Sequence, residues 1–384
     1  MGFRKINLLL SDKSQFIRQV IFVLRGDDME FPTFPSVKTE TTQTDIVSIK
    51  SIYLHVAKAC NLRCSYCYFS ARYPLPDEMS TDEFADLCSD MATVCPQKVI
   101  FTGGEPLLRT DILDLLYGLR DADSEHRVLR CLNTNGHLVT KELSRKLVGL
   151  ADEVRVSLDA MPERNDAQRG KGNFDAAMRA LEYFRSAGFD PKVLVTVTSI
   201  NLPDLEELIC YLIERNITRI NLNYFRPIGR GKGRLDWQVN IKDVVVTLQR
   251  AWKRMFPNLQ TLSEPPEPGS CSNCGVGSFL NIMPNGDVFP CHVLTDREFR
   301  CGNVREQSLV EICRRNGLLD KLAALDFQEL AHQDERLVPL TRSGSCMGNV
   351  YANTKSLPVW NNNLPIFTGN TNCYSPNELQ HCSA

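Results

Sequence analysis

Three cysteines lie within eight residues of one another, in the segment Cys60-Asn-Leu-Arg-Cys64-Ser-Tyr-Cys67. Three thiolates on one loop can hold three corners of a [4Fe-4S] cube, which leaves the fourth iron open to a small molecule. A zinc site is the alternative, with His55 as a fourth ligand, although structural zinc sites usually use paired CxxC knuckles. The pattern therefore favours an iron–sulfur cluster with one reactive corner.

The composition indicates the compartment and the kind of partner. The chain has 15 cysteines in 384 residues, whereas a secreted disulfide scaffold is short and usually has an even count. Asp12 and Lys13 interrupt the N-terminal apolar residues, and no run of eighteen apolar residues exists. A net charge of −2 gives no reason to expect nucleic acid or a membrane surface as partner. We expect a cytoplasmic globular chain with reduced thiols.

Strands and helices must position these cysteines, and the sequence alternates between them. The predicted strands cover residues 52–56, 98–102, 128–133, 154–158, 193–198 and 219–224. The predicted helices include 80–91, where Ser80 and Glu83 have capping-box spacing, 173–186, which Gly188 follows as a stop, and 243–256. This alternation predicts a parallel sheet with right-handed crossovers, either an open partial barrel or a doubly wound sheet. In both, the chemistry lies at the carboxyl ends of the strands.

A proline-rich segment at residues 263–270 ends this alternation and is the best domain boundary in the sequence. We expect an N-terminal extension over 1–46, an α/β domain over 47–260 and a cysteine-bearing domain over 261–384. The stretch from residue 338 onward is expected to be rich in loops.

Two motifs together resemble a known family. The CxxxCxxC spacing, with Tyr66 before the last cysteine, resembles the signature of radical S-adenosylmethionine (SAM) enzymes. The next predicted strand ends in Thr102-Gly-Gly-Glu-Pro106, which is similar to the second motif of that family. The resemblance implies that SAM chelates the open iron through its amine and carboxylate, and that a reduced cluster cleaves it to a 5′-deoxyadenosyl radical. We therefore expect a partial (β/α)6 barrel of parallel strands followed by a small cysteine-rich iron–sulfur extension.

Polar residues at the ends of the predicted strands are candidates for binding SAM. Gly103 and Gly104 would let the backbone approach a ligand, and Glu105 or neighbouring carbonyls could accept hydrogen bonds from its amine. By resemblance, the cofactor-binding residues are Tyr66, Gly103, Gly104, Glu105, Pro106, Asn133, Asn135, Ser157, Asp159 and Arg169. From residue type alone, turns and helix caps explain the Asn, Ser and Asp residues equally well, and Arg169 is equally explained as a solvated surface side chain. The loop 225–231 resembles a loop of peptide-modifying members and would line the substrate mouth.

The C-terminal cysteines resemble a second motif-bearing module. Cys274 and Cys291 bracket Pro284-Asn-Gly286, a turn that predicts a hairpin bringing the two thiols together. This resembles the opening of the SPASM extension of radical SAM maturases, which residues 302–304 and a helix over 308–316 continue. By resemblance we infer one auxiliary [4Fe-4S] cluster, with the ligands Cys271, Cys274, Cys291 and Cys346. Without the fourth ligand, that cluster would be open to substrate.

The other cysteines are expected to act as small buried side chains. Those in predicted helices and strands are Cys88, Cys95, Cys131 and Cys210, and those without an assigned role are Cys301, Cys313, Cys373 and Cys382.

The resemblance predicts a maturase that abstracts hydrogen from a peptide or protein substrate and leads to crosslinking, oxidation or epimerisation. Its electron donor would be a protein such as a flavodoxin or ferredoxin. The alternative is a radical SAM enzyme that acts on a small-molecule cofactor or tetrapyrrole precursor. A non-catalytic cluster or zinc protein is the third interpretation, and it predicts no 5′-deoxyadenosine. No catalytic base is identifiable from the residues.

Overall fold

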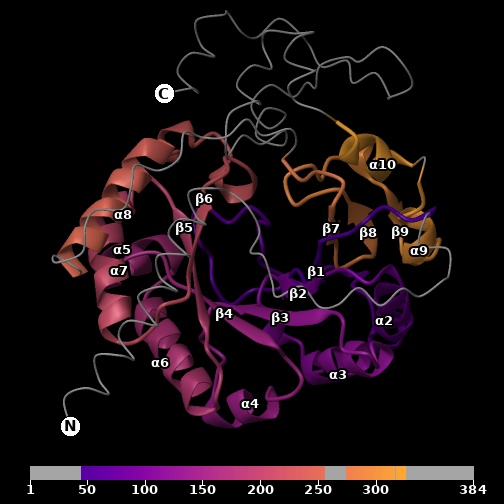
Figure 1. The fold of residues 1–384 in the computed structure, drawn as a ribbon, viewed down its shortest axis with the longest axis horizontal. Helices are drawn as coiled ribbons and strands as arrows, with labels where there is room; N and C mark the ends of the chain where they lie inside the picture. Colours follow the sequence, from indigo (N-terminus) through magenta and orange to yellow (C-terminus); the bar gives the residue numbers. More distant parts are fainter. Residues whose placement is uncertain (1–44, 256–273, 316, 326–384) are drawn as a thin grey trace, which may run out of the picture.

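A single curved sheet forms the centre of the molecule. The computed structural model describes residues 45–255, 274–315 and 317–325. The strands are β1 (Ser51–Ala57), β2 (Lys98–Gly103), β3 (Leu129–Thr134), β4 (Glu153–Ser157), β5 (Lys192–Val197), β6 (Ile220–Tyr224), β7 (Phe279–Ile282), β8 (Asp287–Phe289) and β9 (Gly302–Asn303). The helices are α2 (Thr81–Val94), α3 (Ile112–Ala122), α4 (Lys141–Lys146), α5 (Pro162–Arg169), α6 (Asn173–Ser186), α7 (Leu205–Glu214), α8 (Ile241–Met255), α9 (Leu309–Ile312) and α10 (Leu318–Ala323). Figure 1 shows the strands curving around an open interior, with α3, α4, α6 and α7 on the outer side.

The strand order decides between the two predicted α/β folds. The order is β6-β5-β4-β3-β2-β1-β7-β8-β9, and the strands from β1 to β6 pair in parallel with their neighbours in sequence. In a doubly wound sheet the spatial order of the strands reverses at a switch point. The order of these six strands does not reverse. The prediction of a partial (β/α)6 barrel is therefore confirmed.

Local sequence signals explain where the helices begin and end. Ser80 and Glu83 form the predicted capping box at the start of α2, where two otherwise unsatisfied backbone N–H groups are bonded. Helix α6 covers the predicted residues, and Gly188 follows it with a positive φ of 98°. The core fills the space between these helices and the sheet, and its largest fully buried side chains include Phe84, Phe101 and Phe184. Full burial of one such side chain stabilises the fold by roughly 1.5–3 kcal/mol.

The predicted helix over 308–316 is wrong in its length. Ser308 does cap a helix, but α9 ends at Ile312. The backbone beyond it pairs with the segment before β1: the N–H of Val47 donates to the carbonyl oxygen of Cys313 at 2.8 Å, and Arg314 forms an antiparallel bridge with Ile46. These tertiary contacts use backbone groups that a longer helix would have needed.

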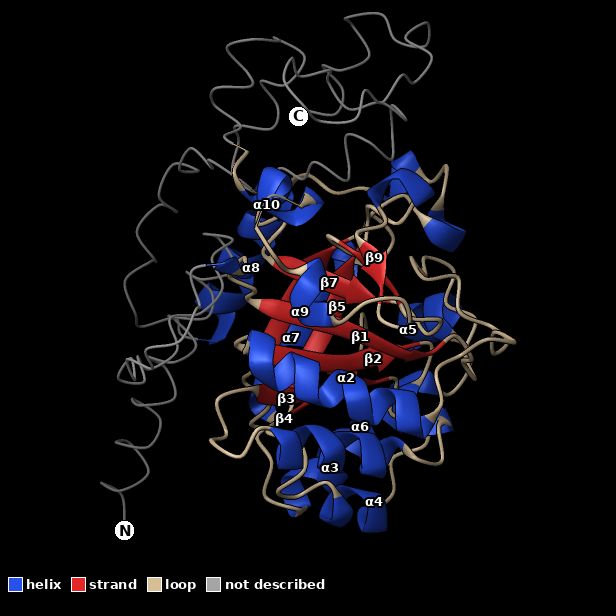
Figure 2. Cartoon of the chain, turned by 90° about the vertical axis from the view of Figure 1, so that its right-hand side faces the viewer, coloured by secondary structure: helices blue, strands red, loops and turns tan. Residues whose placement is uncertain are grey.

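The cysteine-bearing extension continues the barrel sheet. Strand β7 pairs in parallel with β1, with Ser51 beside Phe279, and β8 is antiparallel to both of its neighbours, β7 and β9. Figure 2 shows β7 and β9 in the same sheet as β1 and β2. The domain boundaries at residues 46 and 260 stay predictions, because 1–44 and 256–273 lie outside the described residues.

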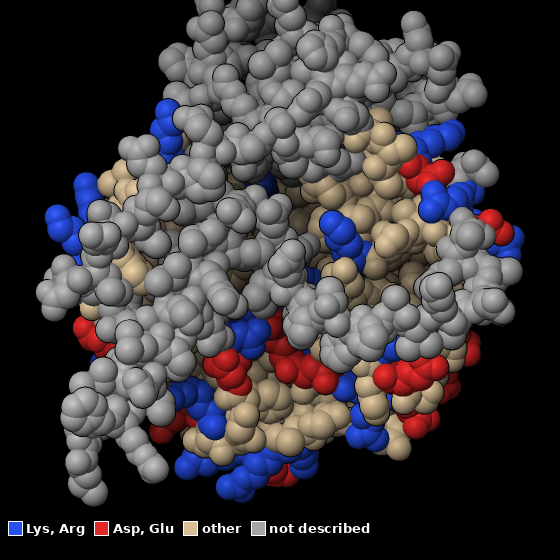
Figure 3. All heavy atoms as spheres, in the orientation of Figure 1, with Lys and Arg blue, Asp and Glu red and all other residues tan. Residues whose placement is uncertain are grey.

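The surface carries both signs of charge. On the face seen in Figure 3, Lys and Arg side chains are interspersed with Asp and Glu. Within the described ranges, no helix combines the length and the apolar character needed to cross a membrane.

Candidate active site

A cavity of about 290 Å³ opens at the carboxyl ends of the barrel strands. Most of the predicted site residues line it, namely Cys60, Cys64, Tyr66, Cys67, Gly103, Gly104, Glu105, Asn133, Asn135, Ser157 and Arg169. Pro106, which opens a short 3-10 helix, and Asp159 lie behind this wall. The structure therefore brings together residues from the loop after β1, from the ends of β2, β3 and β4, and from α5, which the sequence separates by up to about a hundred positions.

The backbone of the cysteine loop is held in place by hydrogen bonds with α5 and with the loop after β6. The N–H of Ser65 donates to the carbonyl oxygen of Gln168 at 2.9 Å, at the end of α5. After β6, Arg230 donates from Nε to the carbonyl oxygen of Cys64 at 2.8 Å and from its backbone N–H to that of Cys67 at 3.0 Å. The three thiols are thus fixed in one wall of the cavity by the protein itself.

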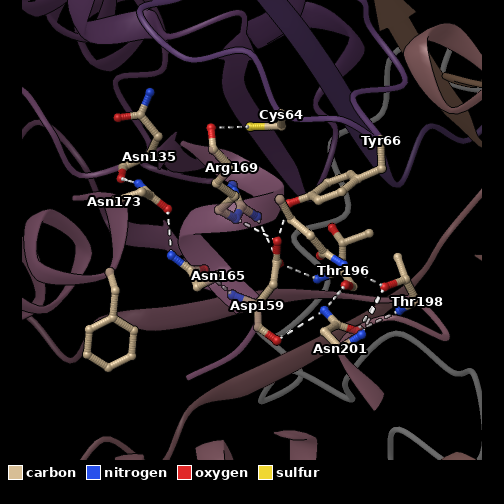
Figure 4. Close-up of polar contacts among 12 residues, drawn as sticks. Cys64, Tyr66, Asn135, Asp159, Asn165, Arg169, Asn173, Thr196, Thr198 and Asn201 are labelled. Carbon is tan, nitrogen blue, oxygen red and sulfur yellow. Dashed lines mark hydrogen bonds and ion pairs between the residues drawn. The ribbon is translucent and has the colours of Figure 1, made fainter. Parts of the chain in front are cut away.

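A buried ion pair lies directly behind the cysteine loop (Figure 4). Arg169 donates from Nε to Oδ2 of Asp159 at 2.6 Å and from Nη2 to Oδ1 at 2.9 Å. Asp159 also accepts hydrogen bonds from the Tyr66 hydroxyl and from the backbone N–H of Thr196. Burial alone would lower the pKa of Arg169, but the Asp159 carboxylate holds it above its ordinary value.

This arrangement gives Tyr66, Asp159 and Arg169 a role that sequence reasoning did not foresee. The pair joins β4 and α5, and the Tyr66 hydroxyl ties the cysteine loop to both. Arg169 is therefore not a solvated surface side chain. Direct contact of these three residues with SAM stays a prediction.

Glu105 is enclosed between β2 and β3. It accepts hydrogen bonds from the Thr134 hydroxyl and the Asn135 backbone N–H, both at 2.8 Å, and from the Leu107 backbone N–H at 3.3 Å. Burial raises the pKa of Glu105 to about 7, although these hydrogen bonds oppose the shift. The carboxyl group thus ties the loop after β2 to the end of β3, and it gives up its proton less readily than an exposed glutamate does.

The two glycines of this loop allow a close approach of two backbones. A Cβ atom on Gly104 would lie 1.9 Å from the carbonyl oxygen of Ala59, and one on Gly103 would lie 2.4 Å from that of Ala57. The resulting contacts are hydrogen bonds of 2.7 Å from the N–H of Gly104 to Ala57 and 2.8 Å from the N–H of Glu105 to Ala59. The two glycines therefore let the loop after β2 lie close to the backbone segment that leads into the cysteine loop. This contact is additional to any contact with a ligand.

Replacement of Gly104 by alanine should destabilise the protein by roughly 1–3 kcal/mol, because the new methyl group overlaps a backbone oxygen that only a main-chain shift can move. The shift would also displace the chain before Cys60 and lower the iron content. The matched control is Gly118→Ala inside α3, where the Cβ meets only the Cys88 sulfur at 3.6 Å. We expect a gain of about 0.5–1 kcal/mol for the control. Urea unfolding measures both, and equal effects of the two variants would contradict the packing argument.

The cysteine thiols suit an iron–sulfur cluster. Cys60, Cys64 and Cys67 form no disulfides, and the backbone N–H of Leu62 donates to the Cys60 sulfur at 3.4 Å. Burial raises the pKa of Cys64 to about 11, although the charge of Arg169 opposes the shift. The protein alone therefore keeps this group protonated, and coordination to iron would remove the proton.

The zinc alternative loses its proposed fourth ligand. His55 is fully buried on β1, and its Nε2 lies 2.7 Å from Oδ1 of Asn281 on β7. Among the residues that the structure describes, no three His, Cys, Asp or Glu side chains converge closely enough to hold one metal ion. A cube needs no such convergence, because each thiolate binds a different iron.

The predicted hairpin of the extension is present, and it carries two of the four predicted auxiliary ligands. The Gly286 N–H donates to the carbonyl oxygen of Met283 at 2.9 Å in the turn between β7 and β8. Cys274 precedes β7 and Cys291 follows β8, so both lie at the open end of the hairpin. The other two predicted ligands, Cys271 and Cys346, lie outside the described residues.

The remaining cysteines mostly follow the prediction. The buried ones are Cys88, Cys131, Cys210 and Cys313. Cys301 is partly buried against the core, and Cys95 is partly exposed because it ends α2 in a left-handed conformation with φ of 51°. Cys373 and Cys382 lie outside the described part of the chain.

The cavity also has lining residues that sequence reasoning missed. They include Tyr53, Arg155, Thr196, Asn221, Asn223 and His292. Alternation along β4 could have identified Arg155, because strand residues two apart face the same side and Ser157 was already a candidate. No local pattern indicates His292, which reaches the cavity only because the hairpin pairs with β1.

Comparisons with known proteins agree with this geometry. The model of the radical SAM superfamily matches residues 54–223, and that of SPASM, an iron–sulfur cluster-binding domain, matches residues 271–347. Mycofactocin maturase MftC of Mycolicibacterium smegmatis is 34% identical over 265 residues, which are 64% of this chain and 65% of the maturase. Fe-coproporphyrin III synthase of Methanosarcina barkeri is 33% identical over 296 residues, which are 67% of this chain and 72% of the synthase.

A solved structure has the same fold. Streptococcus suis SuiB bound to its precursor peptide SuiA superposes with a TM-score of 0.63 over 88% of this chain and 85% of that chain, at 15% identity. The site and fold define a radical SAM protein with an iron–sulfur extension. The chain belongs to the radical SAM superfamily, whose cofactors are a [4Fe-4S] cluster and SAM, and it carries a SPASM domain.

Proposed function

We propose that the protein is a radical SAM maturase that abstracts hydrogen from a peptide or protein substrate. The observation that carries the proposal is the single cavity that joins three free thiols, the Gly103–Glu105 segment and the barrel interior. When bound, the cluster and SAM supply a 5′-deoxyadenosyl radical by reductive cleavage. The modification that follows is a crosslink, an oxidation or an epimerisation.

The residues of the chain position the cofactors and limit access to them. Cys60, Cys64 and Cys67 would hold the cluster, and the polar residues at the ends of β3 and β4 would hold SAM. Arg230 and the Asp159–Arg169 pair hold the cysteine loop in the cavity wall, where its three thiols would hold the cluster. A rigid site favours this chemistry because a misplaced radical would react with the protein itself.

The hairpin extension supports a second part of the proposal, one auxiliary [4Fe-4S] cluster. Cys274 and Cys291 are two of its ligands, and Cys271 and Cys346 complete the set. Such a cluster would accept an electron from the substrate radical as it becomes the oxidised product, while a flavodoxin or ferredoxin would reduce the first cluster. His292, next to Cys291, lines the cavity, so the auxiliary site and the substrate would be neighbours.

A second candidate function is the modification of a tetrapyrrole. The specific observation in its favour is the similarity to the Fe-coproporphyrin III synthase. The alignment covers 72% of the length of that synthase, compared with 65% of the length of the mycofactocin maturase. The two relatives are almost equally identical to this chain. The choice between substrates therefore requires an experiment.

The test offers both substrate classes to the anaerobically reconstituted enzyme with SAM and dithionite. A mixture of short peptides should raise the formation of 5′-deoxyadenosine, and perdeuterated peptides should transfer deuterium into it. Cys291→Ala should still cleave SAM but yield no modified peptide, whereas Cys301→Ala, the matched control in the same extension, should behave as wild type. Deuterium transfer from Fe-coproporphyrin III alone would favour the second function instead.

A further inference from the structure

The deep end of the cavity contains an arginine that the proposed function does not yet use. Arg155 lies in the middle of β4, is only 8% exposed and lines the cavity. It precedes Ser157 by two residues on the same face of the strand, so it lies roughly 6–7 Å further from the carboxyl ends of the strands. Arg155 therefore lies deeper in the barrel than the predicted SAM-binding residues, which lie at the carboxyl ends of the strands.

The charges around Arg155 do not balance. Glu153 forms ion pairs with Arg155, with Lys192 at 3.1 Å and with Arg219. Burial would raise the pKa of Glu153, but these three cations together lower it to about 2. Arg219 also meets the exposed carboxylate of Asp190 at 3.9 Å, so two carboxylates face three cations, and of these three only Arg155 lines the cavity.

The guanidinium of Arg155 also has an unused donor. Its Nε donates to Glu153, and its Nη2 donates to the Cys131 sulfur at 3.3 Å. Its Nη1 makes no hydrogen bond to any described residue, and it is not enclosed by protein atoms. This N–H group is therefore open to water in the cavity, and an anionic oxygen that displaced the water would accept a charge-assisted hydrogen bond from it.

The other charged groups of the cavity already have functions. Among the described residues, its charged lining consists of Glu105, Arg155, Arg169, Arg226 and Arg230. Arg169 is bound to Asp159, and Arg230 is bound to carbonyl oxygens of the cysteine loop. Neither is free for a substrate anion. Arg226 follows β6 at the rim, so Arg155 is the cation at the deep end.

We propose that Arg155 binds a carboxylate of the substrate, and that this carboxylate is the C-terminus of a peptide. A chain terminus can enter the cavity end-on, and one of its carboxylate oxygens can accept a hydrogen bond from Nη1 of Arg155. The inference rests on the proposed peptide function. A propionate of a tetrapyrrole offers the same chemistry, so the test includes it as a separate arm.

The experiment measures ligand retention by the reconstituted enzyme with SAM. An equimolar mixture of hexapeptides with free C-terminal carboxylates and the same sequences with C-terminal amides is ultrafiltered, and the retained peptides are quantified by mass spectrometry. Wild type should retain the acids over the amides by roughly tenfold or more. Arg155→Gln should lower this ratio to near one, and Arg155→Lys should give an intermediate value because it keeps the charge but not the position of the Nη1 donor.

The matched control is Arg219→Gln, which removes another cation from Glu153 but lies outside the cavity lining. It should keep the wild-type ratio. Because Glu153 retains Lys192 and Arg219 in Arg155→Gln, that variant should fold, which circular dichroism checks. Equal retention of acids and amides by wild type, or an unchanged ratio in Arg155→Gln, would overturn the inference.

The second arm compares coproporphyrin III with its tetramethyl ester. Retention of the free acid alone, lost in Arg155→Gln and without retention of any peptide, would keep the carboxylate site but remove the peptide function. Retention of neither class of ligand overturns the role of Arg155.

Discussion

Replacement of Cys60, Cys64 or Cys67 by alanine should lower the formation of 5′-deoxyadenosine to the protein-free background and leave the barrel folded. Each thiol would hold one corner of the cluster, so the loss of one ligand removes the reactive iron site. All three side chains are only partly buried and lie outside the main apolar core, and Cys64 packs against the small cluster of Tyr66, Phe225 and Trp237. The free energy of unfolding of the cofactor-free chain should therefore change by less than about 1 kcal/mol.

The matched control for these variants is Cys88→Ala, which removes a thiol from the core between α2 and α3. It should keep its iron and cleave SAM, while its free energy of unfolding falls by about 1 kcal/mol through the small cavity created. Iron content, 5′-deoxyadenosine yield and urea unfolding distinguish the two patterns. If the Cys60, Cys64 and Cys67 variants unfold, the cysteine loop is part of the folding core and the argument fails.

The fold could be predicted from the sequence because its signals are local. Strand residues alternate with polar loops and amphipathic helices, and the predicted bounds of β1 to β6 lie within two residues of the observed ones. The capping box at Ser80 and the stop at Gly188 act within one turn of chain. The parallel pairing of β7 with β1 could not be predicted in this way, because the sequence of neither strand contains a pattern that identifies the strand it pairs with.

The positions of the candidate site residues could also be predicted, but their contacts could not. The glycines after β2 indicated a close approach, yet the nearest backbone is that of Ala57 and Ala59. Asp159 and Arg169 indicated a polar edge, yet they bind each other. In each case the partner comes from a different loop, so only the tertiary structure determines whether a polar group meets the ligand or the protein.

The contacts behind the cysteine loop suggest how stability and chemistry are connected. The loop is bonded to α5 through Ser65, to the loop after β6 through Arg230, and to the Asp159–Arg169 pair through the Tyr66 hydroxyl. Three separate elements must therefore be in place before the thiols face the cavity together. Substitutions that break one of these supports should affect the cluster even where they touch no cysteine.

The Asp159–Arg169 pair offers the sharpest test of this connection. Asp159→Ala should lower the free energy of unfolding by about 3–5 kcal/mol, because it leaves a buried guanidinium without its carboxylate. The double variant Asp159→Leu with Arg169→Met removes both charges and should recover much of this loss. Urea unfolding of the cofactor-free chain measures both, and iron content after reconstitution reports the state of the cysteine loop.

The control is Glu142→Ala, which breaks the exposed ion pair between Glu142 and Lys146 on α4. It should leave the unfolding midpoint and the iron content unchanged, since exposed pairs contribute little. Asp159→Ala should lower the iron content as well, because the Tyr66 hydroxyl loses its acceptor. The double variant should stay low in iron despite its recovered stability, since it also lacks that acceptor. Full iron content in Asp159→Ala would show that the pair stabilises the barrel without holding the cysteine loop.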